Sequence, residues 1–98
     1  MEAKVNDLYT SLQQIDSRAT EEKRKDFVKW FLKNNMQLFI RSFFKNDLRI
    51  GATAKQLYLG ESTVSFRLNR IEHFTGLNIR HFWDAAQLML CLASCELQ

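Results

Sequence analysis

The sequence predicts an all-α domain of about five to six helices. Its 98 residues contain no Pro and only 3 Gly, so little in the chain interrupts a helix. Long stretches are rich in Leu, Lys, Gln, Glu and Ala, the residues that favour helices. With 46% hydrophobic residues, a chain of this length can bury one core but not two. We therefore expect one compact helical domain with short loops.

The side chains do not assemble a catalytic or metal site in the sequence. Cys91 and Cys95 lie four residues apart in an apolar run, which indicates reduced cysteines and not a disulfide scaffold. Together with His73 and His81 they lack the spacing of a zinc site. There is no Gly-rich phosphate loop, Ser/His/Asp set or pair of carboxylates on an apolar face. We expect no enzyme activity, no cofactor and no metal.

The chain also lacks the signs of export or of a membrane protein. Residues 1–14 have no basic segment followed by an apolar one, so they do not resemble a signal peptide. The longest unbroken apolar run, residues 88–93, is far shorter than the roughly 20 residues that span a bilayer. We expect a cytoplasmic protein, located at the nucleoid if it binds DNA.

Positive charge is concentrated in the middle of the chain. The whole chain has a net charge of +3, whereas residues 41–80 carry seven Lys or Arg and three Asp or Glu, a net +4. Such an excess is typical of a surface that binds a polyanion. It also occurs in small domains merely for solubility, so charge alone leaves both readings open.

The first 45 residues predict three helices. Val5, Leu8, Leu12, Ile15 and Ala19 are spaced as a two-heptad seam, which predicts either a helix packed on the domain or half of a dimer contact. Thr20 followed by Glu21 and Glu22 predicts the start of a second helix, which runs to about Leu32. Asn34 and Asn35 mark a break, and a third helix is expected from about Met36 to Lys45.

Residues 51–72 have the pattern of two short helices joined by a tight turn. Ala54 and Leu57 would form the inner face of the first helix, where a small Ala allows a close crossing. Leu59 would fill the corner, Gly60 would relax the turn, and Ser62 or Glu61 would cap the second helix. The inner face of the second helix is given by the i, i+4, i+7 spacing of Val64, Leu68 and Ile71.

The polar residues left outside this helix pair are suited to DNA. Hydroxyls, an amide and guanidinium groups on a short exposed helix can contact phosphates and base edges in a major groove. The candidate DNA-binding residues are Thr53, Lys55, Glu61, Ser62, Thr63, Ser65, Phe66, Arg67, Asn69 and Arg70. The same helix pattern also occurs in plain helical bundles.

The stretch ATAKQLYLGESTVSFRLNRIEHFTGLNI resembles the C-terminal helix-turn-helix domain of the bacterial regulators of purine catabolism and sugar-diacid utilisation, the PucR/CdaR type. The matching residues are Thr53, Ala54, Leu57, Tyr58, Leu59, Thr63, Val64, Phe66, Arg67, Leu68, Arg70, Ile71, Thr75, Gly76 and Leu77. The closest match covers residues 50–80, and a looser match extends on both sides. The resemblance implies a DNA-binding transcriptional regulator.

Three departures from that family pattern lie at the start of the second helix. Gly60 stands where the family usually has His, Ser62 where it has Asn, and Glu61 at a position that is often basic. Base contacts concentrate at this end of a recognition helix. The base preference of the family therefore does not carry over to this chain.

The end of the chain predicts a cap followed by a closing helix. Thr75-Gly76-Leu77 is typical of a helix C-terminus with a left-handed Gly. The helix expected over residues 81–97 is apolar nearly all round between Leu88 and Ala93, so it is either central to the core or shared across a dimer. The candidate dimer residues are Val5, Leu8, Leu12, Ile15, Trp83, Leu88 and Leu92.

These patterns predict a division of the chain and two possible functions. Residues 1–35 would form N-terminal helices for packing or dimerisation, and residues 36–98 the helix-turn-helix domain with its closing helix. The leading hypothesis is a small homodimeric regulator that reads double-stranded DNA with the helix over residues 62–72. The alternative is a protein-interaction module with a degenerate helix-turn-helix, which captures or antagonises another regulator.

Overall fold

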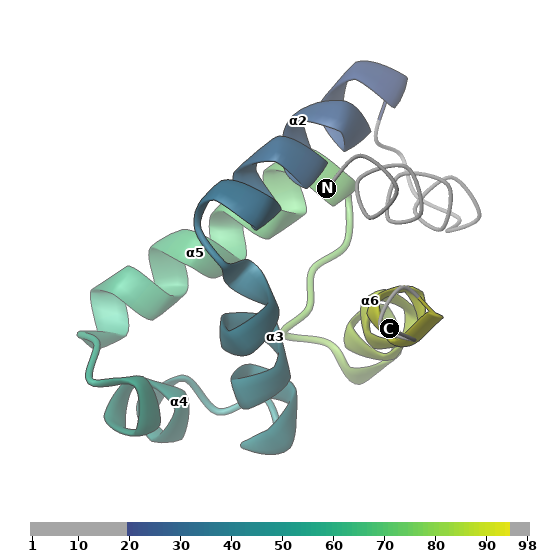
Figure 1. Ribbon diagram of the computed structural model, residues 1–98. Helices are drawn as coiled ribbons and strands as arrows, with labels where there is room; N and C mark the ends of the chain where they lie inside the picture. Colours follow the sequence, from purple (N-terminus) through teal and green to yellow (C-terminus); the bar gives the residue numbers. More distant parts are fainter. Residues whose placement is uncertain (1–19, 95–98) are drawn as a thin grey trace.

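The computed structural model describes residues 20–94, and within that range it contains five α-helices and no strand (Figure 1). The helices are α2 (Glu21–Lys33), α3 (Met36–Lys45), α4 (Ile50–Leu57), α5 (Glu61–Thr75) and α6 (Phe82–Ser94). The predicted all-α class is confirmed. The helix predicted over Val5–Ala19 lies outside the described residues. No described helix has the length and apolar character needed to cross a membrane.

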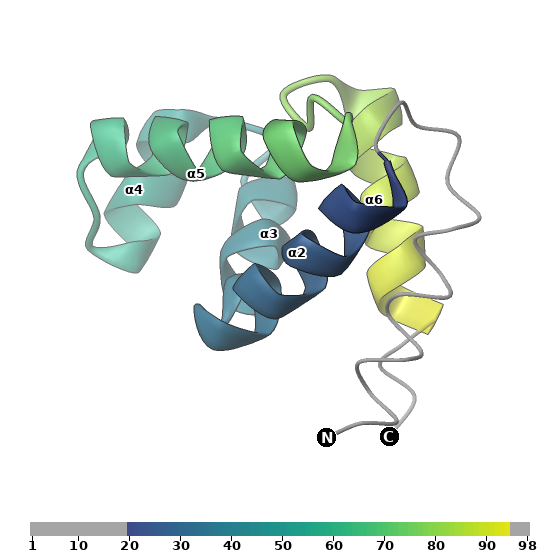
Figure 2. The same ribbon diagram turned by 90° about the horizontal axis from the view of Figure 1, so that it is seen from above.

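Helix α2 packs along α5 (Figures 1 and 2) and brings three large side chains into the core. Its N-terminus is capped as predicted, because Thr20 Oγ1 accepts a hydrogen bond of 3.2 Å from the backbone N–H of Lys23. Phe27, Val28 and Phe31 are buried. Asn34 ends α2 and Asn35 adopts a left-handed conformation with φ 51°, so the predicted break is confirmed at these two residues.

Helix α3 is the central support of the fold and is tied to α4 by a polar network. Its apolar face buries Met36, Phe39, Ile40 and Phe43. At its other end Ser42 Oγ donates to Gln56 Oε1 of α4 over 3.0 Å. Asn46 Nδ2 donates to the same Gln56 oxygen over 2.6 Å, and to the carbonyl of Ser42 over 2.7 Å. These bonds satisfy the buried hydroxyl of Ser42 and hold the last turn of α4, the first helix of the helix-turn-helix, on α3.

Helices α4 and α5 form the predicted helix-turn-helix, with a different turn chemistry. Ala54, Val64, Leu68 and Ile71 are buried between the helices and the core, as predicted. The left-handed residue of the turn is Tyr58, with φ 57°, and not Gly60, whose φ of −75° any residue can adopt. Gly60 is itself the N-cap of α5, so the prediction that Ser62 or Glu61 caps this helix is wrong.

The loop after α5 leads into α6, which packs on α3. Gly76 ends α5 with a φ of 77°, and Leu77 returns to the core, so the predicted cap is confirmed. Leu77 and Ile79 are both buried, whereas Asn78 and Arg80 between them are only half-buried. Helix α6 adds its own core residues, Ala85, Leu88, Cys91 and Leu92.

Candidate nucleic-acid interface

One face of α5 is open to solvent along the whole helix. Ser62, Phe66, Asn69 and His73 are all exposed and recur at i, i+4, i+7 and i+11, so they form a single stripe, here called the outer strip of α5. Phe66 keeps 61% of its surface exposed although it is a large apolar residue. The strip offers a hydroxyl, an aromatic ring, an amide and an imidazole. These groups suit the contacts that a helix makes in a major groove.

Arg80 lies beside the outer strip, although it belongs to the loop before α6. Its Nη2 donates to Oδ1 of Asn69 over 3.1 Å and to the backbone carbonyl of Ser65 over 3.5 Å. The loop that carries it is held by Asn78, whose Oδ1 accepts from the Arg80 backbone N–H over 3.1 Å. Asp84 Oδ2 in turn accepts from the Asn78 backbone N–H over 3.0 Å. A positive charge is therefore positioned at the edge of the strip by a chain of hydrogen bonds.

The sequence predicts that Arg67 and Arg70 face solvent. In the structure both are half-buried, and both guanidinium groups contact aromatic rings. The guanidinium carbon of Arg70 lies 4.9 Å from the ring centre of Phe74 and 6.0 Å from that of Phe66. The guanidinium of Arg67 lies 5.4 Å from the ring centre of Phe39 in α3, which turns it away from the outer strip. The expectation that both are purely outward DNA contacts is corrected, because each also packs on aromatic rings.

Two of the predicted DNA-binding residues, Thr53 and Glu61, do not belong to the outer strip of α5. Thr53 is fully buried and its Oγ1 donates to the carbonyl of Arg49 over 2.8 Å, so its inclusion among exposed contact residues is wrong. A Cβ placed on Gly51 would lie 3.5 Å from Oε2 of Glu61. The exposed carboxylate of Glu61 therefore lies against the first turn of α4, where the helix dipole favours negative charge.

The remaining predicted contact residues are at least partly exposed to solvent. Lys55, Ser62 and Thr63 are exposed, and Ser65 is half-buried. Sequence reasoning missed three further surface residues: Tyr58, His73 and Arg80. The i+11 spacing from Ser62 could have identified His73. Tyr58 is among the residues that match the family pattern, so that pattern could have identified it. Nothing in the sequence places Arg80 beside Asn69, because that contact depends on the path of the loop.

The predicted dimer residues separate into two groups. Trp83 is 72% exposed, whereas Leu88 and Leu92 are buried at 0% and 2% exposure against the core. The assignment of Leu88 and Leu92 to a dimer surface is therefore wrong, because they belong to the face of α6 that packs inside the domain. Val5, Leu8, Leu12 and Ile15 lie outside the described residues.

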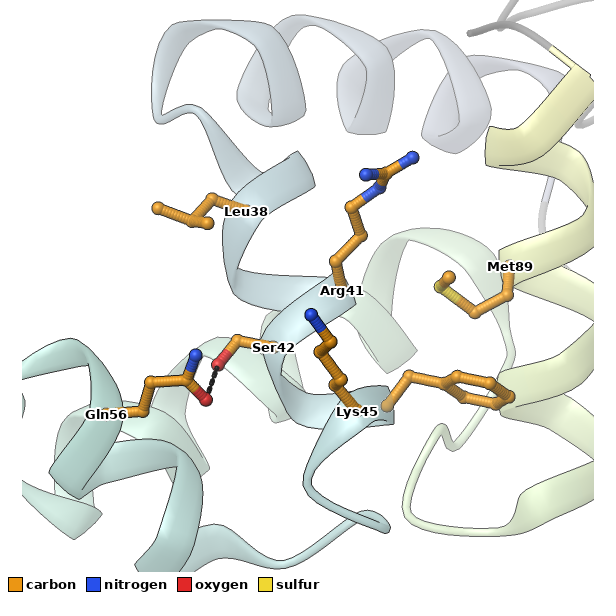
Figure 3. Close-up of a pocket in the computed structure, with 7 residues that line it drawn as sticks. Leu38, Arg41, Ser42, Lys45, Gln56 and Met89 are labelled. Carbon is orange, nitrogen blue, oxygen red and sulfur yellow. Dashed lines mark hydrogen bonds between the residues drawn. The ribbon is translucent and has the colours of Figure 1, made fainter.

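A groove lies apart from the outer strip, between α3, α4 and α6 (Figure 3). Leu38, Phe44 and Met89 give it apolar walls, and its polar lining consists of Arg41, Ser42, Lys45 and Gln56. Figure 3 shows Ser42 and Gln56 bonded to each other at one side of it. In residues 20–94 no three His, Cys, Asp or Glu side chains gather in a way that could hold a metal ion.

Comparison with known proteins gives a match to one family model and a match to one curated protein. The model of the family described as the PucR C-terminal helix-turn-helix domain matches residues 39–94, more than half of the chain. The carbohydrate diacid regulator of Escherichia coli (strain K12) is 34% identical over 53 residues, which cover 54% of this chain. The chain matches only 14% of the length of that regulator. No solved structure gave a significant match.

Proposed function

This chain belongs to the PucR C-terminal helix-turn-helix domain family, and from that membership we propose that α5 is a recognition helix that reads duplex DNA sequence-selectively. A domain of this family implies DNA binding in transcription regulation and not catalysis. The observation that carries the proposal is the outer strip of α5, which stays exposed from Ser62 to His73 while the opposite face is buried. The protein would act where the DNA is, in the cytoplasm at the nucleoid.

In the proposed complex the outer strip enters the major groove. Ser62 and Asn69 would hydrogen-bond base edges, and the exposed ring of Phe66 would contact a thymine methyl group. Arg70 and Arg80 flank the strip, and Lys55 and Tyr58 are exposed on α4 and its turn, so these four side chains would contact phosphates. Glu61 is directed at α4 and is left out of the contact set.

The pairing of Asn69 with Arg80 indicates which base edges the strip would prefer. An Asn that reads adenine uses both its amide oxygen and its amide nitrogen. Here Oδ1 of Asn69 accepts from Arg80, which orients the amide group and leaves its nitrogen, a donor, without that contact. A donor fits the acceptors of a purine edge, N7 of adenine or guanine and O6 of guanine. We therefore expect a purine at the position that faces Asn69.

The proposal also covers the oligomeric state of the chain and its effect on transcription. A single short helix makes few base contacts, whereas two copies related by a two-fold axis read half-sites about one helical turn apart. The proposed active form is a homodimer on a palindromic site. Activation and repression would depend on where that site lies relative to a promoter.

Selection of bound duplexes from a random library tests the proposal. The wild-type chain should enrich a short sequence motif, and the triple variant Ser62→Ala, Phe66→Ala, Asn69→Ala should enrich none. Leu38→Ala is the matched control, because Leu38 is exposed in the groove between α3, α4 and α6 and lies outside the strip. Enrichment of the same motif by the triple variant would contradict the assignment of α5.

A protein-interaction role is the second candidate, and two exposed aromatic residues favour it. Tyr58 is 95% exposed and Phe66 is 61% exposed on the same motif. Exposed aromatic side chains are enriched at protein interfaces. If the chain binds no duplex at low salt but forms a complex with a transcriptional regulator that Phe66→Ala abolishes, this second function replaces the first.

A further inference from the structure

The face of α6 that points away from the core carries a regular apolar stripe. Trp83 and Leu90 are each 72% exposed, Ala93 is exposed and Ala86 is half-buried. These four residues follow one another at spacings of three, four and three, the heptad spacing of a helix–helix contact. We call them the outer seam of α6. Phe82, which is 66% exposed, lies beside it and stacks on Phe44.

The outer seam is complementary to itself in one orientation. If two α6 helices pair antiparallel about an axis at the level of Leu88, Trp83 faces Ala93 of the second copy. In the same arrangement Leu90 faces Ala86. Each large side chain then meets a small one, which allows close packing. A parallel pair would instead place Trp83 on Trp83 and Ala86 on Ala86, and would leave clashes next to gaps.

Charge also permits this pairing. Within α6, from Phe82 to Ser94, Asp84 is the single charged residue, and its carboxylate accepts from the backbone N–H of Asn78. The α6 helices themselves therefore bring no like charges together when two seams approach, and the antiparallel helix dipoles attract. Helix α6 lies at the end of the molecule opposite α4 (Figures 1 and 2), so a copy docked there does not cover α4.

We propose that a second copy of this chain binds the outer seam of α6, in an antiparallel two-fold pairing of Trp83 with Ala93 and of Leu90 with Ala86. This names the interface of the homodimer in the proposed function, but it holds or fails without DNA. Each copy contributes three large exposed side chains, Phe82, Trp83 and Leu90. Together the two copies would bury roughly 800 Å², which is less than the area of a standard stable interface. The dimer is therefore weak in free solution and is strengthened when both half-sites are bound to one duplex.

Sedimentation equilibrium of the whole chain, without DNA, tests the pairing. At protein concentrations between roughly 10 and 500 µM, the wild-type chain should show an equilibrium between monomer and dimer. Ala86→Glu or Leu90→Lys alone should weaken dimerisation about tenfold or more, because each places a charge in an apolar contact. A mixture of the two variants should restore it to within about threefold, because the carboxylate introduced in one copy then faces the ammonium group introduced in the other.

A second mixture fixes the orientation. Ala93→Glu with Leu90→Lys should not restore dimerisation in the antiparallel arrangement, because position 93 faces position 83. In a parallel pair this mixture would also restore it, since those positions lie one turn apart, and that result would overturn the proposal. A wild-type chain that stays monomeric throughout, or an Ala86→Glu and Leu90→Lys mixture that stays monomeric while circular dichroism shows both variants folded, would overturn it too. If the wild-type chain dimerises as expected but neither it nor any variant binds duplex DNA, the proposed function is refuted, whereas the proposed pairing of α6 is not.

Discussion

Nη2 of Arg80 lies 3.1 Å from Oδ1 of Asn69, and this bond joins the loop before α6 to the outer strip of α5. The two residues are eleven positions apart in the sequence. Neither belongs to the apolar spacing that predicts the buried face of α5. The contact adds a positive charge to a face whose own side chains are neutral or imidazole. It also orients the amide group of Asn69, because Oδ1 is held toward Arg80.

Arg80→Ala should weaken duplex binding about five- to tenfold and reduce the salt dependence by about one phosphate contact. The expected cause is the loss of one cation at the edge of the groove. Lys45→Ala is the matched control, because it removes the same charge from the groove between α3, α4 and α6. Fluorescence anisotropy at several salt concentrations measures both variants, and equal losses would refute a special role for Arg80.

Arg67→Ala and Arg70→Ala should each lower the free energy of unfolding by roughly 0.5–1 kcal/mol, the range expected for a cation over an aromatic ring. Arg70 contacts two rings, so its loss should be the larger. Urea denaturation followed by circular dichroism measures the effect. If both variants are as stable as wild type, the ring contacts contribute nothing and the two residues are solvent-facing as the sequence predicts.

Tyr58→Asn should raise stability by up to about 1 kcal/mol, because Asn tolerates the left-handed conformation that Tyr58 adopts with φ 57°. The same substitution should weaken duplex binding, since it removes an exposed ring and hydroxyl from the turn of the proposed interface. Thermal melting and anisotropy on one preparation check the two effects. A variant that gains stability and binds duplex as tightly as wild type would exclude Tyr58 from the interface.

Val64→Asp should unfold the domain, at a cost of at least about 3 kcal/mol, because it buries an unpaired carboxylate where α5 packs on the core. Ser62→Asp is the control at an exposed position two residues away, and it should remain folded. Far-ultraviolet circular dichroism distinguishes the two outcomes. A folded Val64→Asp domain would mean that the inner face of α5 is misassigned.

Local chemistry made much of this fold predictable. The hydroxyl of Thr20 and the missing side chain of Gly76 act within one turn of their own position, so the sequence alone predicts both helix ends. The buried face of α5 follows from the spacing of Val64, Leu68 and Ile71. Such features depend on neighbours along the chain and need no knowledge of the fold.

Apart from the N-cap of α5, the wrong predictions concern residues whose surroundings depend on the tertiary fold. Thr53 looks like an exposed polar residue, but tertiary packing buries it and its hydroxyl bonds inside its own helix. Arg67 meets Phe39 only because the fold brings this side chain of α3 within reach of α5. In α6 apolar residues lie all round the helix, so periodicity could not assign Leu88 to the core and Leu90 to the surface.

The affinity of the whole chain for duplex DNA as a function of salt decides whether the outer strip of α5 is a DNA-binding surface. If the outer strip and its flanking cations bind DNA, the plot of log affinity against log salt should fall linearly with a slope of about −3 to −6 for a dimer. The Arg80→Ala variant should give a shallower slope. No measurable binding to any duplex at low salt, or an affinity that does not change with salt, would show that the outer strip does not bind DNA.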